Sequence, residues 1–270
     1  MTDPASRFSG VARQYDAVRP MPPVALADVI RQWAGTDDPE VVDLGAGTGL
    51  STVIWAGRAR RVTAVEPSAQ MRALALRRIS AVEAAGPGRA ATEFGAIDAT
   101  AEDTGLPGAC ADVVTASQAL HWFDPARALP EIARLLRAGG VFASYDCDWP
   151  PCIDWETDAA FTAAAGATSA LARARGLRPA HAGKEHHAGR LRGSGLFRHV
   201  TEIAVTGREE GDAARLVAIA RSVLADAGPL IAGGASEDDL GLTRLREVAE
   251  RRLNRPRTWW WTYRMQLAVK

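Results

Sequence analysis

Apolar side chains follow two different spacings along the chain between about residue 24 and residue 150. Stretches with an apolar residue at every third or fourth position predict helices over 22–35, 49–59, 68–86 and 125–140. Short apolar runs between them predict strands over 40–44, 61–67, 92–97, 110–120 and 140–148. Because strands that alternate with helices usually pair in parallel, this part of the chain is expected to form a parallel sheet with helices on both faces.

The pattern changes after Asp148. Helical spacing dominates the rest of the chain, in 149–176, 212–228 and 236–253, with a loop and a short helix over 181–197. Strand patterns return over 198–209 and 257–270. No linker is long enough to separate two independent domains.

We therefore predict one α/β domain over residues 1–270. It would contain a Rossmann-like, mostly parallel sheet of seven strands, with helices on both faces and the last strand antiparallel. Its cofactor-binding core would span about 24–150. The N-terminal segment 1–23 and the helices within about 154–253, at 154–178 and 212–253, would form a lid over a substrate.

Charge and composition narrow the function. Lys and Arg together number 32, as do Asp and Glu, so the formal net charge is zero and no basic excess indicates a nucleic-acid partner. No apolar stretch approaches the ~18 residues of a membrane span. The three cysteines, Cys110, Cys147 and Cys152, form no CxxC pair and indicate a reducing compartment rather than a disulfide frame or a zinc site. A cytoplasmic protein is expected, a monomer or homodimer that binds a small molecule and neither membrane nor nucleic acid.

Three glycines follow the first predicted strand, at Gly45, Gly47 and Gly49 in "EVVDLGAGTGLS". A turn from a strand into a helix directs free backbone N–H groups at a ligand above the sheet. Dinucleotide sites have the spacing G-x-G-x-x-G, with a pyrophosphate at the helix N-terminus. Here the spacing is G-x-G-x-G, and the strand ends in Asp43, whose charge would be unfavourable beside a pyrophosphate and favourable beside an ammonium.

Glu66 ends the next predicted strand, 19 residues after Gly47. An acidic residue at this distance can accept hydrogen bonds from both hydroxyls of an adenosine ribose, in NAD and in S-adenosylmethionine alike. Asp43 and Glu66 together favour an adenosine that carries an amino-acid tail.

With these motifs the chain resembles the class I S-adenosylmethionine-dependent methyltransferases. The resemblance rests on "VVDLGAGTG", "VTAVEPSAQM", "ATAEDTGLP", "ADVVTASQALHWFD" and "LRAGGVFA", and it covers about residues 8–150 and the final strand. The wording "SQALHWFD" and the N-terminal "FSGVARQYDAVRP" are most similar to the small-molecule branch that includes trans-aconitate methyltransferase.

The resemblance implies a cofactor site, residue by residue. Asp43, Gly45, Ala46 and Gly47 would face the methionine part of the cofactor, and Glu66 its ribose. The adenine would be bordered by Pro67, Met71, Thr100, Ala101 and Glu102, where Thr100 stands at a position that is often acidic in the family. Ser117 and Gln118 would lie beside the sulfonium, and Tyr15 and Arg19 would close over the cofactor.

Histidines and aromatic residues are the candidates on the acceptor side. His121 follows the fourth core strand and is either a general base or a packing residue at a strand end. His181, His186 and His187 form either a polar loop or part of an acceptor site, without the spacing of metal ligands. Several rings either hold a substrate or cover seams between helices and sheet: Trp122, Phe123, Tyr145, Trp149 and Trp155. In 258–263, Trp259 and Trp261 should face one way and Trp260 the other, with both faces buried against helices.

The sequence thus predicts methyl transfer from S-adenosylmethionine to an oxygen, nitrogen or carbon of a small molecule, with S-adenosylhomocysteine as the product. The apolar lid suggests an acceptor larger than a metabolite acid. Two alternatives remain open: a nicotinamide-dependent oxidoreductase, and a protein that binds the cofactor without transferring the methyl group.

Overall fold

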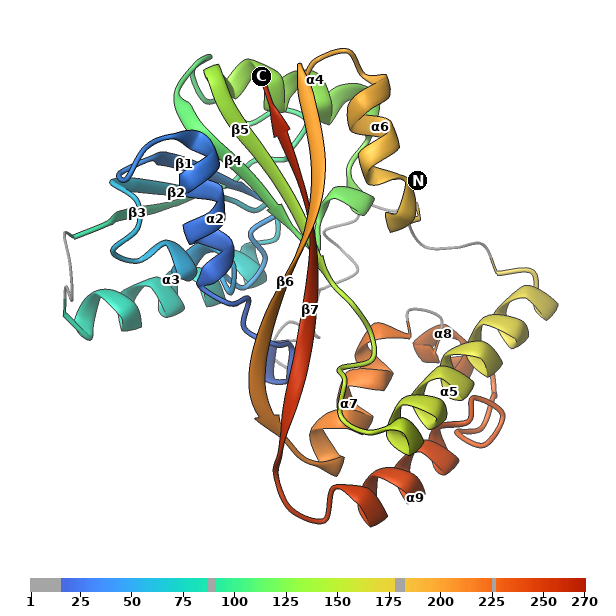
Figure 1. Cartoon of the computed structure of the whole chain (residues 1–270). Coiled ribbons are helices and arrows are strands. Elements are labelled where there is room, and N and C mark those ends of the chain that lie inside the picture. The colour runs from blue at the N-terminus through green and yellow to red at the C-terminus, as the bar shows by residue number, and fades with distance from the viewer. Residues whose placement is uncertain (1–15, 87–90, 178–182, 225–226) are drawn as a thin grey trace.

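Seven strands form one sheet in the computed structural model, which describes residues 16–86, 91–177, 183–224 and 227–270 (Figure 1). The strands are β1 (Glu40–Leu44), β2 (Arg61–Val65), β3 (Glu93–Ile97), β4 (Ala111–Ser117), β5 (Leu136–Cys147), β6 (His199–Gly211) and β7 (Arg257–Val269). Their order in the sheet is β3-β2-β1-β4-β5-β7-β6.

All pairs from β3 to β5 are parallel, and β7 runs antiparallel to both β5 and β6. The predicted fold class is therefore confirmed, including the antiparallel last strand. Because β1, β2 and β4 are parallel, their carboxyl ends meet at one edge of the sheet, where ligands of open α/β sheets bind.

Helices cover both faces of this sheet. Leu26 and Ile30 of α2 (Ala25–Ala34) pack in one buried cluster with Val41 of β1. The next residue of β1, Val42, faces the other way and shares a second cluster with Ile132 of α4 (Pro125–Leu135). This alternation of side chains along a central strand is what a doubly covered sheet requires.

The long helix α3 (Ala69–Ala84) follows β2 and begins as predicted at Ser68, whose side chain accepts a hydrogen bond from the Met71 N–H. The helix α4 ends earlier than expected. Its residues from Leu136 onward belong to β5, because Leu136 pairs with Ala111 of β4.

The segment after the glycine turn differs from the prediction. Instead of an α-helix over 49–59, the structure has a short 3₁₀ helix, η2 (Thr52–Trp55), flanked by turns. The Thr52 hydroxyl donates to Asp43 of β1 at 2.7 Å, and the following Val53 and Ile54 are β-branched. Side-chain hydrogen bonds to another element and β-branched residues both weaken an α-helix, so the segment forms a 3₁₀ helix instead.

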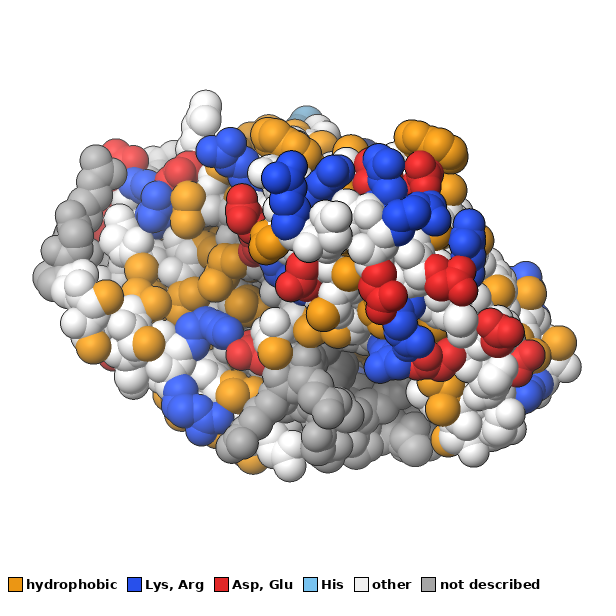
Figure 2. Space-filling model, turned by 90° about the horizontal axis from the view of Figure 1, so that it is seen from below, with side chains coloured by type: hydrophobic (Ala, Val, Ile, Leu, Met, Phe, Trp, Pro, Cys, Tyr) orange, Lys and Arg blue, Asp and Glu red, His pale blue; other side chains and the backbone are white. Residues whose placement is uncertain are grey.

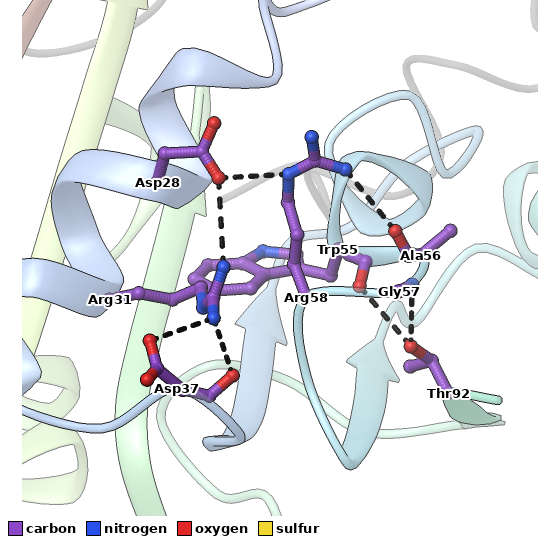
Figure 3. Close-up of polar contacts among 8 residues, drawn as sticks. All are labelled: Asp28, Arg31, Asp37, Trp55, Ala56, Gly57, Arg58 and Thr92. Carbon is purple, nitrogen blue, oxygen red and sulfur yellow. Dashed lines mark hydrogen bonds and ion pairs between the residues drawn. The ribbon is translucent and has the colours of Figure 1, made fainter. Parts of the chain in front are cut away.

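Polar contacts hold the turn after η2 against its neighbours (Figure 3). The Arg58 guanidinium binds Asp28 of α2 at 3.0 Å. The Thr92 hydroxyl accepts a hydrogen bond from the Gly57 N–H at 2.9 Å and donates one to the Trp55 carbonyl at 3.3 Å. The indole of Trp55 is fully buried beneath these contacts.

Four helices gather beside the far end of the long β6–β7 pair (Figure 1). They are α5 (Trp155–Ala174), α7 (Ala213–Val223), α8 (Ala227–Ala232) and α9 (Leu242–Arg252). A separate short helix, α6 (His187–Gly193), lies against β6 after the 3₁₀ turn η4 (Lys184–His186). Figure 2 views the molecule from the end that carries the four helices and shows acidic and basic side chains interspersed there. Their ion pairs include Arg246–Glu237 and Arg251–Glu156.

Trp259 and Trp261 of β7 are buried in the core that joins the sheet to these helices. Trp260 faces the other way and is 49% exposed. The prediction of alternating faces holds, but burial of both faces was wrong, because β7 is covered on only one side at this level.

Gly49 provides a test of how the turn packs on α3. Its φ is +81°, and a Cβ at this position would lie 3.0 Å from the Cα and Cβ of Ala75 in α3. We predict that Gly49→Ala lowers the free energy of unfolding by about 3 kcal/mol, from the left-handed backbone together with overpacking.

Gly47→Ala is the matched control, since its φ is +57° but its Cβ would meet only a carbonyl oxygen at 4.0 Å. Its expected cost is about 1 kcal/mol. Urea unfolding of both variants checks this, and equal losses would contradict the packing argument.

Candidate functional site

A cavity opens at the carboxyl ends of β1, β2 and β4, with further wall residues from β7 and from the N-terminal segment. Its predicted lining residues are Arg19, Gly45, Ala46, Gly47, Glu66, Pro67, Met71, Thr100, Ala101, Glu102, Ser117 and Gln118. Three of the candidate acceptor-side rings also line it: Trp122, Phe123 and Trp149. Lining residues that the sequence did not single out are Pro20, Pro22, Thr48, Leu50, Ser51, Ala119 and Tyr263. Tyr15 lies outside the described residues.

Gly45 and Gly47 of the turn after β1 line the cavity, and neither has a side chain that would fill it. Gly45 has φ +62°, and a Cβ on it would come within 2.8 Å of the Ala119 Cβ and 3.2 Å of the Phe123 ring. Only glycine lets the segment after β4 approach the turn so closely. The Ala46 N–H donates to the Val65 carbonyl of β2 at 3.1 Å, which ties the turn to the neighbouring strand.

Glu66 joins the two turns that frame the cavity. One of its carboxylate oxygens accepts the Gly47 N–H at 2.9 Å and the other accepts the Ser68 N–H at 2.8 Å. Burial raises the pKa of Glu66 although these backbone donors oppose it. A carboxylate held in this way offers its remaining lone pairs to two adjacent hydroxyls on a ligand.

Asp43 is placed differently from the prediction of contact with the ligand. Its side chain is fully buried and does not line the cavity. Hydroxyls of Thr52 and Thr115 each donate to it at 2.7 Å, and Ser51 donates at 3.4 Å. Of these partners only Ser51 reaches the cavity wall, so Asp43 acts on the site by holding the segment after the turn.

The loop after β3 forms the wall beyond Glu66. Thr100 pairs with Asp103 in an isolated bridge, and the Glu102 carboxylate accepts the Asp124 N–H at 3.0 Å. The nearby acid Asp98 is bound to Arg72 at 2.8 Å and does not line the cavity. Thr100 therefore lines the cavity at the position that is often acidic in the family.

The tip of β4 carries a strained residue. Gln118 has φ +52°, a region that residues other than glycine rarely adopt, and its N–H donates to the Tyr145 carbonyl at 2.9 Å. Its side-chain oxygen accepts from the Lys184 ammonium at 2.6 Å. Lys184 lies 66 residues further along the chain, and no sequence pattern connected the two.

Aromatic rings form another part of the cavity wall. Trp122, Phe123 and Trp149 line the cavity, and the Arg19 guanidinium lies 5.0 Å from the centre of the Trp149 ring. Two other rings from the predicted group lie elsewhere: Tyr145 is fully buried and Trp155 is 76% exposed, and neither lines the cavity.

His121 and His187 are brought together behind the cavity wall. Both are buried, and each has a ring nitrogen near the Asp146 carboxylate, at 3.6 Å for His121 and 3.5 Å for His187. His121 does not line the cavity, so the structure does not place the candidate base against a ligand. For His187 the polar-loop alternative is wrong, since α6 carries it into the interior. His186 is exposed and pairs with Glu185, and His181 is outside the described residues.

Asp146 is the centre of this buried group. Burial would raise the pKa of Asp146, but His187, the Lys184 ammonium at 2.8 Å and His121 lower it to about 2. The ligand atoms of His121, Asp146 and His187 all lie within 4.8 Å of one another, a spacing that could hold a metal ion. The Lys184 ammonium already binds the Asp146 carboxylate and supplies positive charge at the place where a metal ion would do so.

Comparison with known proteins relates the part of the chain around the cavity to methyltransferases. A family model described as a methyltransferase domain matches residues 42–144, from β1 into β5. An uncharacterised methyltransferase of Mycobacterium tuberculosis is 36% identical over 138 residues, which are 51% of each chain. The chain carries a class I S-adenosylmethionine-dependent methyltransferase domain. The narrower resemblance to trans-aconitate methyltransferase stays a prediction.

Two further relatives of the methyltransferase domain extend the comparison. Malonyl-(acyl-carrier protein) O-methyltransferase of Pectobacterium atrosepticum is 33% identical over 140 residues, 52% of this chain and 51% of that protein. The chain thus spans about half the length of the curated relatives it matches. A solved structure of a candidate type II methyltransferase from Anaeromyxobacter dehalogenans covers 93% of this chain and 97% of its own, with 25% identity and a TM-score of 0.64.

Burial of Asp43 predicts a pH dependence of stability. Burial raises the pKa of Asp43 to about 6, above the roughly 3.9 of an unfolded chain. The folded state then binds the proton more tightly, so this contribution to the free energy of unfolding is present below about pH 4 and is lost as the pH rises through about 6. About 2 pKa units correspond to about 3 kcal/mol.

We predict that Asp43→Asn removes this loss. Urea unfolding of both proteins between about pH 4 and about pH 7 measures it, as the difference between the two pH profiles. Parallel profiles would show that Asp43 titrates normally in the folded protein.

Proposed function

We propose that the protein transfers the methyl group of S-adenosylmethionine to a small-molecule acceptor and releases S-adenosylhomocysteine. The observation that carries the proposal is Glu66, a buried carboxylate on the cavity wall, anchored by the N–H groups of Gly47 and Ser68. Its placement suits the two ribose hydroxyls of an adenosine. The absence of a side chain at Gly45 supports the proposal because it lets a ligand come close to the backbone.

The chain's own residues would orient the cofactor along the cavity. Met71 and Ala101 are buried apolar side chains that line it on the Glu66 side and suit an adenine. Ser117 and Gln118 lie at the other end, beside the position expected for the sulfonium. When bound, S-adenosylmethionine supplies an electrophilic methyl group, so the protein's main task is to align the acceptor with it.

We also propose that the helices beyond β5 and the N-terminal segment form the acceptor side. Trp149 lies between β5 and α5, and Tyr263 lies in the middle of β7, the strand that follows α9; both line the cavity. Arg19, Pro20 and Pro22 of the N-terminal segment line the cavity as well. The rings of Trp122, Phe123 and Trp149 favour an acceptor with an apolar part.

The remaining expectations also belong to this proposal. A small-molecule acceptor is supported by the mixed surface charge in Figure 2, which provides no basic stripe on the face shown. None of the described helices has the length and apolar character needed to cross a membrane. Cys110, Cys147 and Cys152 are free thiols, which supports a reducing compartment such as the cytoplasm.

Binding of S-adenosylhomocysteine, measured by calorimetry beside NAD, tests the proposal. We predict binding of S-adenosylhomocysteine and a weakening of about tenfold to about a hundredfold in Glu66→Gln, because a hydrogen bond to a charged group contributes about 1.5–3 kcal/mol. Glu93→Gln is the matched control: Glu93 is exposed on β3, pairs with Arg61 and does not line the cavity.

Preferential binding of NAD would favour the oxidoreductase instead. Incubation of the protein with S-adenosylmethionine and a pool of small metabolites, followed by mass spectrometry, separates transfer from binding alone. A product about 14 Da heavier than its precursor is expected; cofactor binding with no methylated product from any pool would favour a non-transferring role.

A further inference from the structure

Lys184 connects a buried carboxylate to the cavity wall. Its ammonium lies 2.8 Å from Asp146 of β5 and 2.6 Å from the side-chain oxygen of Gln118 at the tip of β4. The sequence contains only one other lysine, Lys270, and arginine supplies the remaining basic residues. An ammonium is a compact charge whose three donors can turn toward two different acceptors. The donors of an arginine guanidinium are fixed in one plane, so arginine would not make the same two short contacts.

This contact decides how the Gln118 amide lies. An ammonium has three donors and no acceptor, so the amide must present its oxygen to Lys184. Its NH₂ group is then the polar group of this side chain that remains for a ligand. The left-handed backbone of Gln118 and the bond from its N–H to the Tyr145 carbonyl hold the residue in place while the side chain is oriented.

Asp146 keeps the ammonium in position. The carboxylate is buried, with an exposed side-chain fraction of 9%, and an unpaired charge there would be costly. Imidazoles of His121 and His187 flank it at 3.6 Å and 3.5 Å. The Lys184 side chain, by contrast, is 30% exposed and would favour water without this partner.

We propose that Lys184 is a positioning residue that turns the NH₂ group of Gln118 toward the methyl-transfer end of the cavity, and that the acceptor therefore presents a hydrogen-bond-accepting atom there rather than an ammonium. The inference rests on the proposed function. If the methylated atom is an oxygen, it can accept a hydrogen bond from Gln118 with one lone pair and keep another lone pair for the methyl group. A protonated amine would meet the N–H donors of Gln118 and find no acceptor for its own protons on that side chain.

Sinefungin and S-adenosylhomocysteine form a pair of probes for this orientation. Sinefungin carries a cationic amine where S-adenosylmethionine has its methyl group, whereas S-adenosylhomocysteine carries nothing there. In the wild type the amine meets the NH₂ group of Gln118. In Lys184→Met the amide can turn and accept from the amine, so sinefungin should bind about tenfold more tightly while S-adenosylhomocysteine changes less than about twofold.

Four further proteins make the test decisive: one control, one double variant without the ion pair, and two proteins that lack Gln118. Lys270→Met is the control, since Lys270 donates to the Leu136 carbonyl at 2.7 Å and does not line the cavity; it should change neither affinity. The double variant Asp146→Asn with Lys184→Met removes both charges together, so it serves if the single variant folds poorly. It should show the same change in affinities as Lys184→Met. In a Gln118→Met background, Lys184→Met should no longer change the ratio of the two affinities.

An unchanged ratio in both the single and the double variant would overturn the inference, and so would a change that persists without Gln118. These results leave the proposed function standing as long as the wild type binds S-adenosylhomocysteine. Failure of the wild type to bind it would overturn the proposed function and this inference with it.

Discussion

The carboxylate of Glu66 is the interaction on which the cavity depends. It accepts one N–H from the glycine turn after β1 and another from the start of α3, and so links the segments that follow two neighbouring strands. Without it, the N–H groups of Gly47 and Ser68 would lose their partner, and an unsatisfied buried donor such as that of Ser68 costs about 1–3 kcal/mol. Because parallel pairing brings the ends of β1, β2 and β4 to one edge, a single side chain can organise this whole side of the site.

The two acids that follow from the sequence have different tasks. Asp43 accepts hydrogen bonds from the hydroxyls of Ser51, Thr52 and Thr115 and so fixes the segment after the glycine turn against β1 and β4. Glu66 lines the cavity and is the residue proposed to bind the ribose. Burial raises the pKa of both carboxyl groups, and the donors around each one oppose that effect. One acid therefore shapes the backbone, and the other is available for recognition.

Two basic side chains lie near the part of the cavity that is proposed for the acceptor. Lys184 is bound to Asp146 and to Gln118, and Arg19 lies over Trp149 on the acceptor side. Acids line the part proposed for the ribose, and cations or amide donors border the part proposed for the acceptor. The sulfonium would lie between them.

Local patterns predicted much of this arrangement. The strand 40–44, the glycine turn and Glu66 follow from residues close together in the chain, and twelve of the predicted cofactor residues line the cavity. Long-range contacts were beyond the same reasoning. The 3₁₀ form of η2 depends on the bond from Thr52 to Asp43, and the burial of His187 depends on how α6 packs. Lys184 gains its role from partners on β4 and β5, which no spacing in the sequence indicates.

A crystal structure of the protein with S-adenosylhomocysteine tests the central claim most directly. The account predicts that both ribose hydroxyls donate to Glu66, with the adenine against Met71 and the sulfur beside Ser117 and Gln118. A cofactor bound elsewhere, or bound in this cavity with its ribose away from Glu66, would contradict it.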